Sequence, residues 1–177
     1  MLYEIVTTKK IVVTPKPDAG AAAILPAGRE IRERVKRLFR GSLAIRVATA
    51  GSTNACEQEL VALGNAVYDV ERFGIRFVAS PRHADMLIVT GPVSRNMREA
   101  LRRTYEAMPG PKIVVALGDD AADGGIFRGS YAVLDGAASV IPVHYRIAGD
   151  PPSAYTILCA LLEILNDLDA KEAPPPA

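Results

Sequence analysis

The stretch that decides the fold runs from Ser42 to Leu60 and reads SLAIRVATAGSTNACEQEL. Its first half has the alternating apolar pattern of a β-strand, and the pattern breaks at Ala50 and the glycine that follows. A helical pattern then begins at Cys56 and places Leu60 on its apolar face. This order predicts a strand, a tight loop and a helix. In an open α/β sheet such a loop lies at the carboxyl edge of the strands, where ligands bind and a helix N-terminus presents free N–H groups.

The composition limits the classes of function. The chain has 177 residues, of which 49% are hydrophobic and 23% charged, as in one globular domain of ordinary size. Its 21 basic and 20 acidic residues leave a net charge of +1, so no overall field attracts nucleic acid or an anionic membrane. Two distant cysteines, Cys56 and Cys159, give no disulfide framework, and neither a cleavable signal nor a membrane-spanning apolar run is evident. We therefore expect a cytoplasmic protein with no nucleic-acid partner.

Two segments precede the deciding stretch. Residues 1–28 combine short β-rich runs with prolines and an alanine tract, which predicts either an extended arm that docks on another surface or a disordered tail. Residues 29–41 predict a basic amphipathic helix, because Ile31, Val35 and Leu38 share one face beside six basic and two acidic residues. Such a helix either contacts an acidic partner or membrane surface, or packs against its own domain. We expect both segments to be dispensable for folding and necessary for assembly with partners.

The remainder of the chain alternates strands with helices. The helix of the deciding stretch is expected to run to about residue 70. Further strands are predicted at 75–79, 86–90, 113–117 and 140–145, further helices at 94–108 and 153–168, and a Gly- and Ala-rich loop at 121–138. Residues 169–177 are expected to form a mobile tail. The alternation predicts an α/β fold with a central parallel sheet, in which the loops beginning near Gly51, Gly118 and Gly149 converge on one edge.

Two long stretches carry a resemblance to a known family. They read YDVERFGIRFVASPRHADMLIVTGPVSRNMREALRRTYEAMPGPKIVVALGDDAADGGIFRGSYAV at 68–133 and IPVHYRIAGDPPSAYTIL at 141–158. Both are similar to the small electron-transfer subunit of membrane-bound energy-converting nickel-iron hydrogenases, whose counterpart in respiratory complex I (NADH:ubiquinone oxidoreductase) is the 20 kDa subunit. The resemblance implies a flavodoxin-like three-layer sandwich over residues 42–168. It also implies a hetero-oligomer with a large subunit and membrane-arm subunits, peripheral on the cytoplasmic side of the inner membrane, and one four-iron, four-sulfur cluster.

The cluster-ligand positions of this family fall on the three converging loops. Where the hydrogenase pattern is G-S-C-N-x-C, this chain reads GSTNAC, so the first two positions are Thr53 and Cys56. The patterns G-D-C and P-G-C-P-P place the other two at Asp120 and Asp150. A cubane cluster is normally held by four thiolates, and a hydroxyl and two carboxylates are poor replacements for soft sulfur ligands. We therefore expect a degenerate member of the family, in which these positions are vestigial and no cofactor is bound.

Other interpretations of the same loops stay open. The hydroxyls of Thr49, Ser52 and Thr53, in a loop that opens a helix, resemble the phosphate loop of flavodoxins, which would suggest a flavin nucleotide. Cys56 with the two aspartates could instead hold a divalent metal such as zinc, and its place at a helix N-terminus could make it a reactive thiol. An unusual flavin or metal would make the chain an active electron-transfer subunit. A further alternative is a stand-alone binding protein.

The sequence predicts no catalytic residues. The two histidines, His83 and His144, lie outside the ligand loops, and we interpret His83 as a structural hydrogen-bonding group. No nucleophile with a paired base and no phosphate-loop lysine motif is found. The prediction is a structural or coupling subunit of a hydrogenase-like or complex I-like oxidoreductase complex whose catalysis belongs to its partners.

Overall fold

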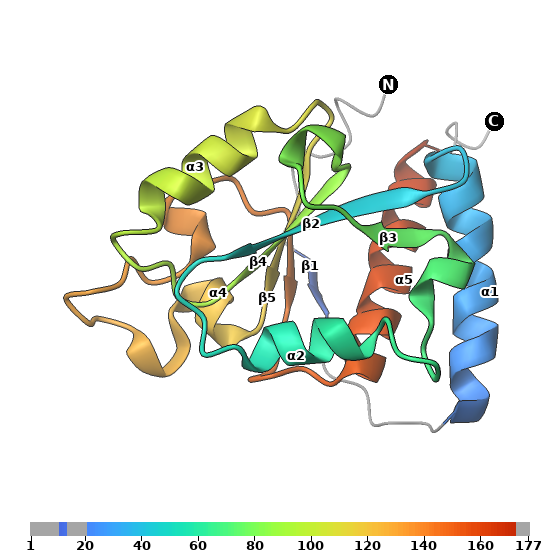
Figure 1. The fold of residues 1–177 in the computed structure, drawn as a ribbon, viewed down its shortest axis with the longest axis horizontal. Coiled ribbons are helices and arrows are strands. Elements are labelled where there is room, and N and C mark those ends of the chain that lie inside the picture. The colour runs from blue at the N-terminus through green and yellow to red at the C-terminus, as the bar shows by residue number, and fades with distance from the viewer. Residues whose placement is uncertain (1–10, 14–20, 173–177) are drawn as a thin grey trace.

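A computed structural model describes residues 11–13 and 21–172 of the chain. The strands of this part form one six-stranded sheet in the order β1-β6-β5-β4-β2-β3, and every neighbouring pair is parallel (Figure 1). The strands are β1 (Ile11–Val13), β2 (Leu43–Thr49), β3 (Ile75–Phe77), β4 (Met86–Thr90), β5 (Ile113–Leu117) and β6 (Tyr145–Ile147). Counted from β2, the last five strands lie in the order 2-1-3-4-5, which is the flavodoxin-like order. The predicted flavodoxin-like α/β fold is therefore confirmed.

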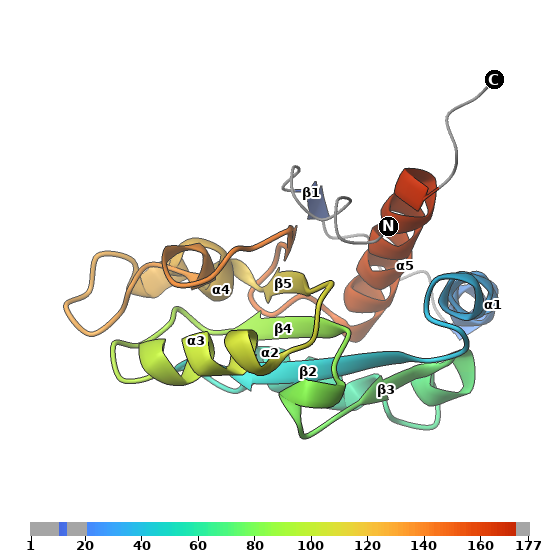
Figure 2. The same ribbon diagram turned by 90° about the horizontal axis from the view of Figure 1, so that it is seen from above.

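Helices cover both faces of the sheet and complete the three layers (Figure 2). The helices are α1 (Ala21–Leu38), α2 (Ala55–Ala62), α3 (Arg98–Ala107), α4 (Asp119–Asp123) and α5 (Ala154–Glu172), with short 3-10 turns η2 (Val70–Phe73), η3 (Pro81–His83), η4 (Gly125–Phe127) and η5 (Ala137–Ser139). Helices α1, α2 and α5 share one hydrophobic core, and α3 belongs to the core on the opposite face. None of the helices in the described part combines the length and the hydrophobicity that crossing a bilayer requires.

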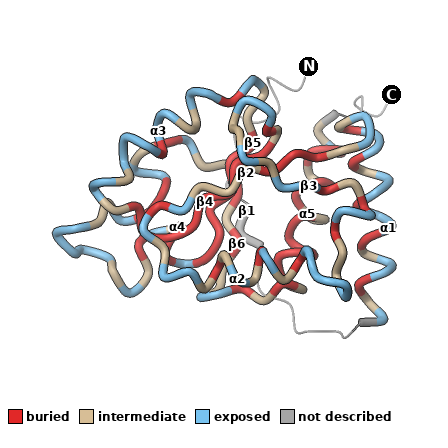
Figure 3. The backbone as a smooth tube through the Cα atoms, in the orientation of Figure 1, coloured by how far each residue is buried: buried red, intermediate tan, exposed pale blue. Residues whose placement is uncertain are grey.

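The central strands are buried on both faces. In β4, Ile88 belongs to the core beneath α1, α2 and α5, whereas Leu87 and Val89 belong to the core beneath α3. Figure 3 shows this burial along the middle of the sheet. A strand covered on both sides needs apolar residues at every position, so β4 and β5 appear in the sequence as short continuous apolar runs. The predicted bounds of both strands are confirmed.

The predicted boundary between an N-terminal arm and a basic helix is wrong. Helix α1 begins at Ala21, because the alanine tract favours helix and Pro26 removes only one backbone donor near its start. The interpretation that this helix packs against its own domain is correct, since Ile31, Val35 and Leu38 are buried in the core. The helix is therefore part of the folded domain, and we expect its removal to expose this core and destabilise the fold. Of the expected arm, only β1 and residues 21–28 at the start of α1 are described, and the remainder lies outside the described residues.

Polar contacts fix α1 on α5. Arg34 donates from Nε to Oδ1 of Asn166 and from Nη1 to Oδ2 of Asp169, both over 2.8 Å. Arg37 Nε lies 2.9 Å from Oδ1 of the same carboxylate, which is 7% exposed. Two basic residues of the predicted amphipathic helix thus serve an internal contact.

Local hydrogen bonding explains where α2 ends. The helix stops at Ala62 instead of continuing to residue 70. The side-chain oxygen of Asn65 accepts hydrogen bonds from the N–H groups of Val67 at 2.8 Å and Tyr68 at 3.0 Å. Such a turn offers the backbone an alternative to the helix.

Several other bounds also differ from the prediction. The strand expected at 140–145 is β6, which begins at Tyr145 because its register starts opposite Val115 and a proline precedes it at 142. The strand expected at 75–79 ends at Phe77, and α3 begins at Arg98 instead of residue 94. The loop expected at 121–138 contains η4, η5 and the last part of α4. Helix α5 continues to Glu172, so the expected tail at 169–177 begins inside a helix, and 173–177 lie outside the described residues.

Candidate functional site

The three loops predicted to converge do meet at the carboxyl edge of the sheet. The N–H of Gly118, after β5, donates to the carbonyl of Ile147 at the end of β6, over 2.9 Å. The next residue, Asp119, donates from its N–H to Gly149 O at 3.0 Å and accepts from Gly149 N–H at 3.1 Å through Oδ1. The loops after β5 and β6 are thus joined by reciprocal hydrogen bonds.

Cys56 brings the third loop to the same place. It lies in the first turn of α2, and its side chain is buried. A Cβ atom added to Gly118 would stand 2.8 Å from the sulfur, and this glycine also has a φ of +88°, so both conditions favour glycine there. Burial raises the pKa of the thiol to about 12, and the carboxylates of Glu57 and Asp150 add to the shift. The thiol is therefore protonated at neutral pH, which argues against a reactive cysteine.

Asp120 carries the most unusual polar atom of the site. The residue is 4% exposed, and its Oδ1 has no hydrogen-bond partner within the described part of the chain. This oxygen lies against Gly125, because a Cβ atom on that glycine would stand 2.2 Å from it. Burial raises the pKa of the carboxyl, and the charges of Asp150, Asp119 and Asp123 raise it further. A buried anion without a partner destabilises the fold unless it is protonated or screened.

The remaining two predicted positions lie at the surface. Thr53 and Asp150 are both exposed. Cys56, Asp120 and Asp150 are close enough to influence one another electrostatically, whereas the side chain of Thr53 makes no hydrogen bond to any described residue. In the described ranges, no three His, Cys, Asp or Glu side chains gather into a group that could hold a metal ion.

These donors do not fit a four-iron, four-sulfur cluster. Such clusters are held by thiolates, and the four family positions supply one thiol, one hydroxyl and two hard carboxylates. One of the carboxylates, Asp120, places its unpartnered oxygen against Gly125. The second cysteine, Cys159, lies within α5 and not on any of the three loops. The identity of the four residues as former ligand positions rests on the resemblance and stays a prediction.

Glu57 is a site residue that the sequence reasoning missed. Its carboxylate accepts hydrogen bonds from the hydroxyls of Ser52 at 2.6 Å and Thr90 at 2.5 Å. Burial acts to raise the pKa of Glu57, but the hydrogen bonds from Ser52, Thr90 and Thr49 outweigh it and hold the pKa below its usual value. The contact ties α2 to β4 at the point where the strand order reverses, which is where ligands bind in this class of fold. The sequence feature that could have identified Glu57 is a carboxylate in the first turn of a helix that follows a hydroxyl-rich loop.

The same contact weakens the flavin alternative. The Ser52 hydroxyl is engaged by Glu57, and a hydrogen bond with the Thr49 side chain also lowers the pKa of that carboxylate. The hydroxyls of Ser52 and Thr49 are therefore already engaged, whereas the hydroxyl of Thr53, the third residue of this alternative, has no partner among the described residues.

The two histidines have different surroundings. His144 accepts the Val114 N–H at Nδ1 over 2.9 Å, and burial followed by the charge of Lys171 lowers its pKa. His83 is exposed, and its ring makes no hydrogen bond to any described residue. The interpretation of His83 as a structural hydrogen-bonding group is therefore wrong, and His144 has that role.

Solved structures share this fold. A chain of the membrane-bound sulfane sulfur reductase, an archaeal respiratory membrane complex, superposes with a TM-score of 0.65 at 28% identity, covering 87% of this chain and 78% of that one. A chain of an NAD+-reducing [NiFe]-hydrogenase in the H2-reduced state superposes with a TM-score of 0.56 at 18% identity, covering 71% of this chain and 92% of that one. The second likeness concerns the fold alone.

Sequence relatives extend over most of the domain. An uncharacterized protein of Methanocaldococcus jannaschii is 43% identical over 131 residues, which are 73% of this chain and 88% of that protein. Formate hydrogenlyase subunit 7 of Escherichia coli is 39% identical over 137 residues, 77% of this chain, so the match spans about half of that subunit's length, 53%. Residues 54–164 match the family described as NADH ubiquinone oxidoreductase, 20 Kd subunit. The chain belongs to the family of the 20 kDa subunit of NADH:ubiquinone oxidoreductase.

Proposed function

We propose that this chain is a subunit of a membrane-associated, hydrogenase-like or complex I-like oxidoreductase complex in which it binds no iron–sulfur cluster of its own. Its role there is structural or coupling, and the redox chemistry belongs to its partners. The observation that carries the proposal is the site itself. The three loops converge at Cys56, Gly118 and Gly149, whereas Thr53, Asp120 and Asp150 stand where the family pattern has cysteine.

The relatives support the first half of this proposal. A relative at 39% identity is a subunit of formate hydrogenlyase, and the structural relative at 28% identity belongs to a membrane-bound archaeal respiratory complex. We infer that this chain contacts a catalytic large subunit and membrane-arm subunits. It would then lie at the cytoplasmic face of the membrane and be held there by those partners.

The donor chemistry supports the second half. Cluster assembly needs thiolates that face a common centre, and the site offers one buried, protonated thiol. Hydrogen bonds between the loops hold the edge of the sheet together without a ligand. The fold can therefore persist without the cluster.

Co-purification tests the proposed assembly. A tagged chain is expressed from its own locus, the membranes are solubilised in mild detergent, and the captured proteins are identified and quantified. We expect a large subunit and integral membrane proteins in about equimolar amounts. A chain that elutes alone from the soluble fraction would favour the stand-alone binding protein instead.

A further inference from the structure

Strand β2 has an open edge. Its pairing with β3 ends at Ile45, which accepts the last hydrogen bond from Val78 N–H at 2.9 Å, while its pairing with β4 continues to Thr49. Figure 1 shows β2 running on beyond β3. Because backbone groups alternate in direction along a strand, the N–H and C=O of Val47 and Thr49 face the side that β3 has left. No described residue forms a backbone hydrogen bond with these groups.

An apolar pocket lies beside this edge on the α2 face. It has a volume of about 300 Å³ and is lined by Val47, Glu57, Leu60, Val61, Gly64 and Phe77. Val61 is 69% exposed and Phe77 is 37% exposed, so two large apolar side chains face solvent next to unpaired backbone groups. Exposed strand edges with adjoining apolar surface are sites at which another chain adds a strand.

A second hollow, of about 290 Å³, lies beside the same edge on the α3 face, and it contains Arg46. The Nε atom of Arg46 is buried without a hydrogen-bond partner, and the side chain forms no ion pair with a described residue. Helix α3 contributes Ala100, Leu101 and Thr104 to the hollow, and its N-cap residue contributes Met97; none of these is an acid.

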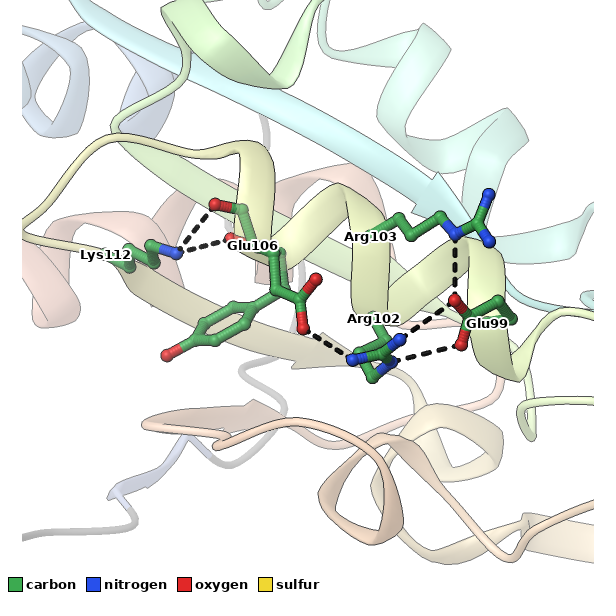
Figure 4. A network of polar contacts seen from close by, with 6 residues as sticks. Glu99, Arg102, Arg103, Glu106 and Lys112 are labelled. Carbon is green, nitrogen blue, oxygen red and sulfur yellow. Dashed lines mark hydrogen bonds and ion pairs between the residues drawn. The ribbon is translucent and has the colours of Figure 1, made fainter.

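The carboxylates of α3 are engaged elsewhere. Glu99 binds Arg102 at 2.9 Å and Arg103 at 2.8 Å, and Glu106 binds Arg102 at 2.8 Å (Figure 4). Arg46 is therefore a cation without an anionic partner in the described part of the chain, and an acidic side chain that entered the hollow would pair with its guanidinium.

We propose that the outer edge of β2 from Arg46 to Thr49 binds an extended segment of a partner subunit, which adds a strand in line with β3. Side chains alternate along a strand, so neighbouring residues of the incoming segment enter opposite hollows. The segment presents an acidic residue to Arg46 on the α3 face and flanking apolar residues to the pocket of Val61 and Phe77 on the α2 face. Its backbone pairs with Val47 and Thr49. This proposal rests on membership of a multi-subunit complex and is independent of the cluster question.

Amide hydrogen exchange tests the pairing. The amides of Val47 and Thr49 are measured at residue resolution in the isolated full-length chain and in the complex purified through it. We expect fast exchange in the isolated chain and protection at least 100-fold greater in the complex. The amides of Arg46 and Ala48 point to β4 and serve as internal controls, protected in both samples.

Two pairs of variants test the hollows through the yield of co-purified partner. Val61→Asp and Arg46→Glu should each reduce this yield at least 10-fold. Val67→Asp, at a position that is 55% exposed and does not line the pocket, and Arg76→Glu, exposed on β3, should leave it unchanged. Melting temperatures within 3 °C of the parent would show that every variant is folded.

Several outcomes would overturn the proposal. Equal exchange of Val47 and Thr49 in both samples would show that no strand is added there. Protection that is already present in the isolated chain and is lost on deletion of residues 1–10 would assign the edge to the chain's own N-terminal segment. If the chain purifies without partners, the proposed function fails as well, whereas co-purifying partners with fast-exchanging amides would contradict the edge assignment alone.

Discussion

The carboxylate of Glu57 accepts a hydrogen bond of 2.5 Å from the hydroxyl of Thr90, so that the first turn of α2 is tied to the end of β4. This relationship, together with the bond from Ser52, fixes the loop of the candidate site without any bound group. Replacing Glu57 removes the acceptor of at least two hydrogen bonds at once. The pair is therefore the first place to test what stabilises the site.

The Glu57→Ala variant should have a free energy of unfolding about 2 kcal/mol lower than that of the parent at pH 7, because hydrogen bonds to a charged group contribute about this much. The pKa of Glu57 is lowered in the folded state, so its contribution is present above the ordinary pKa of 4.5 and is lost as the pH falls through the folded value. Urea unfolding at pH 7 and at pH 3 measures the difference. Gln58→Ala, exposed on the same helix, is the matched control, and equal losses in both variants would contradict the assignment.

The Asp120→Asn variant should be more stable than the parent at pH 7, by about 1 kcal/mol, because it removes a buried charge whose Oδ1 lacks a partner. The folded pKa of Asp120 is raised, so the penalty is absent below the ordinary pKa of 3.8, grows as the pH rises above that value and is complete above the folded pKa. The disadvantage of the parent should therefore shrink toward pH 4. Thermal unfolding from pH 4 to 8 tests this, with Glu71→Gln, at an exposed position of η2, as the control. A destabilised Asp120→Asn would indicate that the carboxylate has a partner of its own.

Cys56 should react slowly with alkylating reagents. With a pKa of about 12, its thiolate fraction at pH 8 is about 1,000-fold below that of a thiol with the ordinary value of 9.0. In a Cys159→Ala background, which leaves one cysteine, we expect iodoacetamide labelling at least about 100-fold slower than in urea. Adding Asp150→Asn should accelerate the folded reaction, because that carboxylate raises the pKa. Labelling of the folded chain at the urea rate would show an exposed thiol with an ordinary pKa and would contradict this prediction.

The triple variant Thr53→Cys, Asp120→Cys, Asp150→Cys should allow a cluster to be reconstituted with iron and sulfide. The loops already meet, so the change supplies the missing thiolates to a preformed edge. Single replacements should fail, because each leaves two positions without sulfur. If the folded triple variant takes up no more iron than the singles, the four residues are not equivalent to the family's ligand positions.

The sequence predicted the elements whose hydrophobic pattern is unambiguous. Strands β4 and β5 are buried on both faces and bounded by glycine or proline, and so their limits could be read directly. Where a side chain offers the backbone a hydrogen bond in place of the helical one, the hydrophobic pattern was insufficient to predict where the element ends. The end of α2 depends on the Asn65 turn, and the start of β6 depends on a register opposite Val115 that no local signal encodes.

The candidate site was predicted in outline only. Topology alone was sufficient to bring the loops of Cys56 and Gly118 together, because parallel strands end at the same edge. The contacts that hold the edge could not be predicted, since Glu57 and Thr90 are far apart in sequence. Arg46 was overlooked for a similar reason, because its lack of a partner depends on where β3 ends and on how α3 pairs its own acids.

The central claim is that this chain binds no iron–sulfur cluster, and the most direct test is its iron and acid-labile sulfide content. The wild-type chain is purified under strict exclusion of oxygen, separated from its partners, and measured for iron, sulfide and visible absorption. We predict colourless protein with far less than one cluster's worth of iron, because only Cys56 among the four positions offers sulfur. Close to four iron and four sulfide per chain, with a broad visible band, would contradict the account.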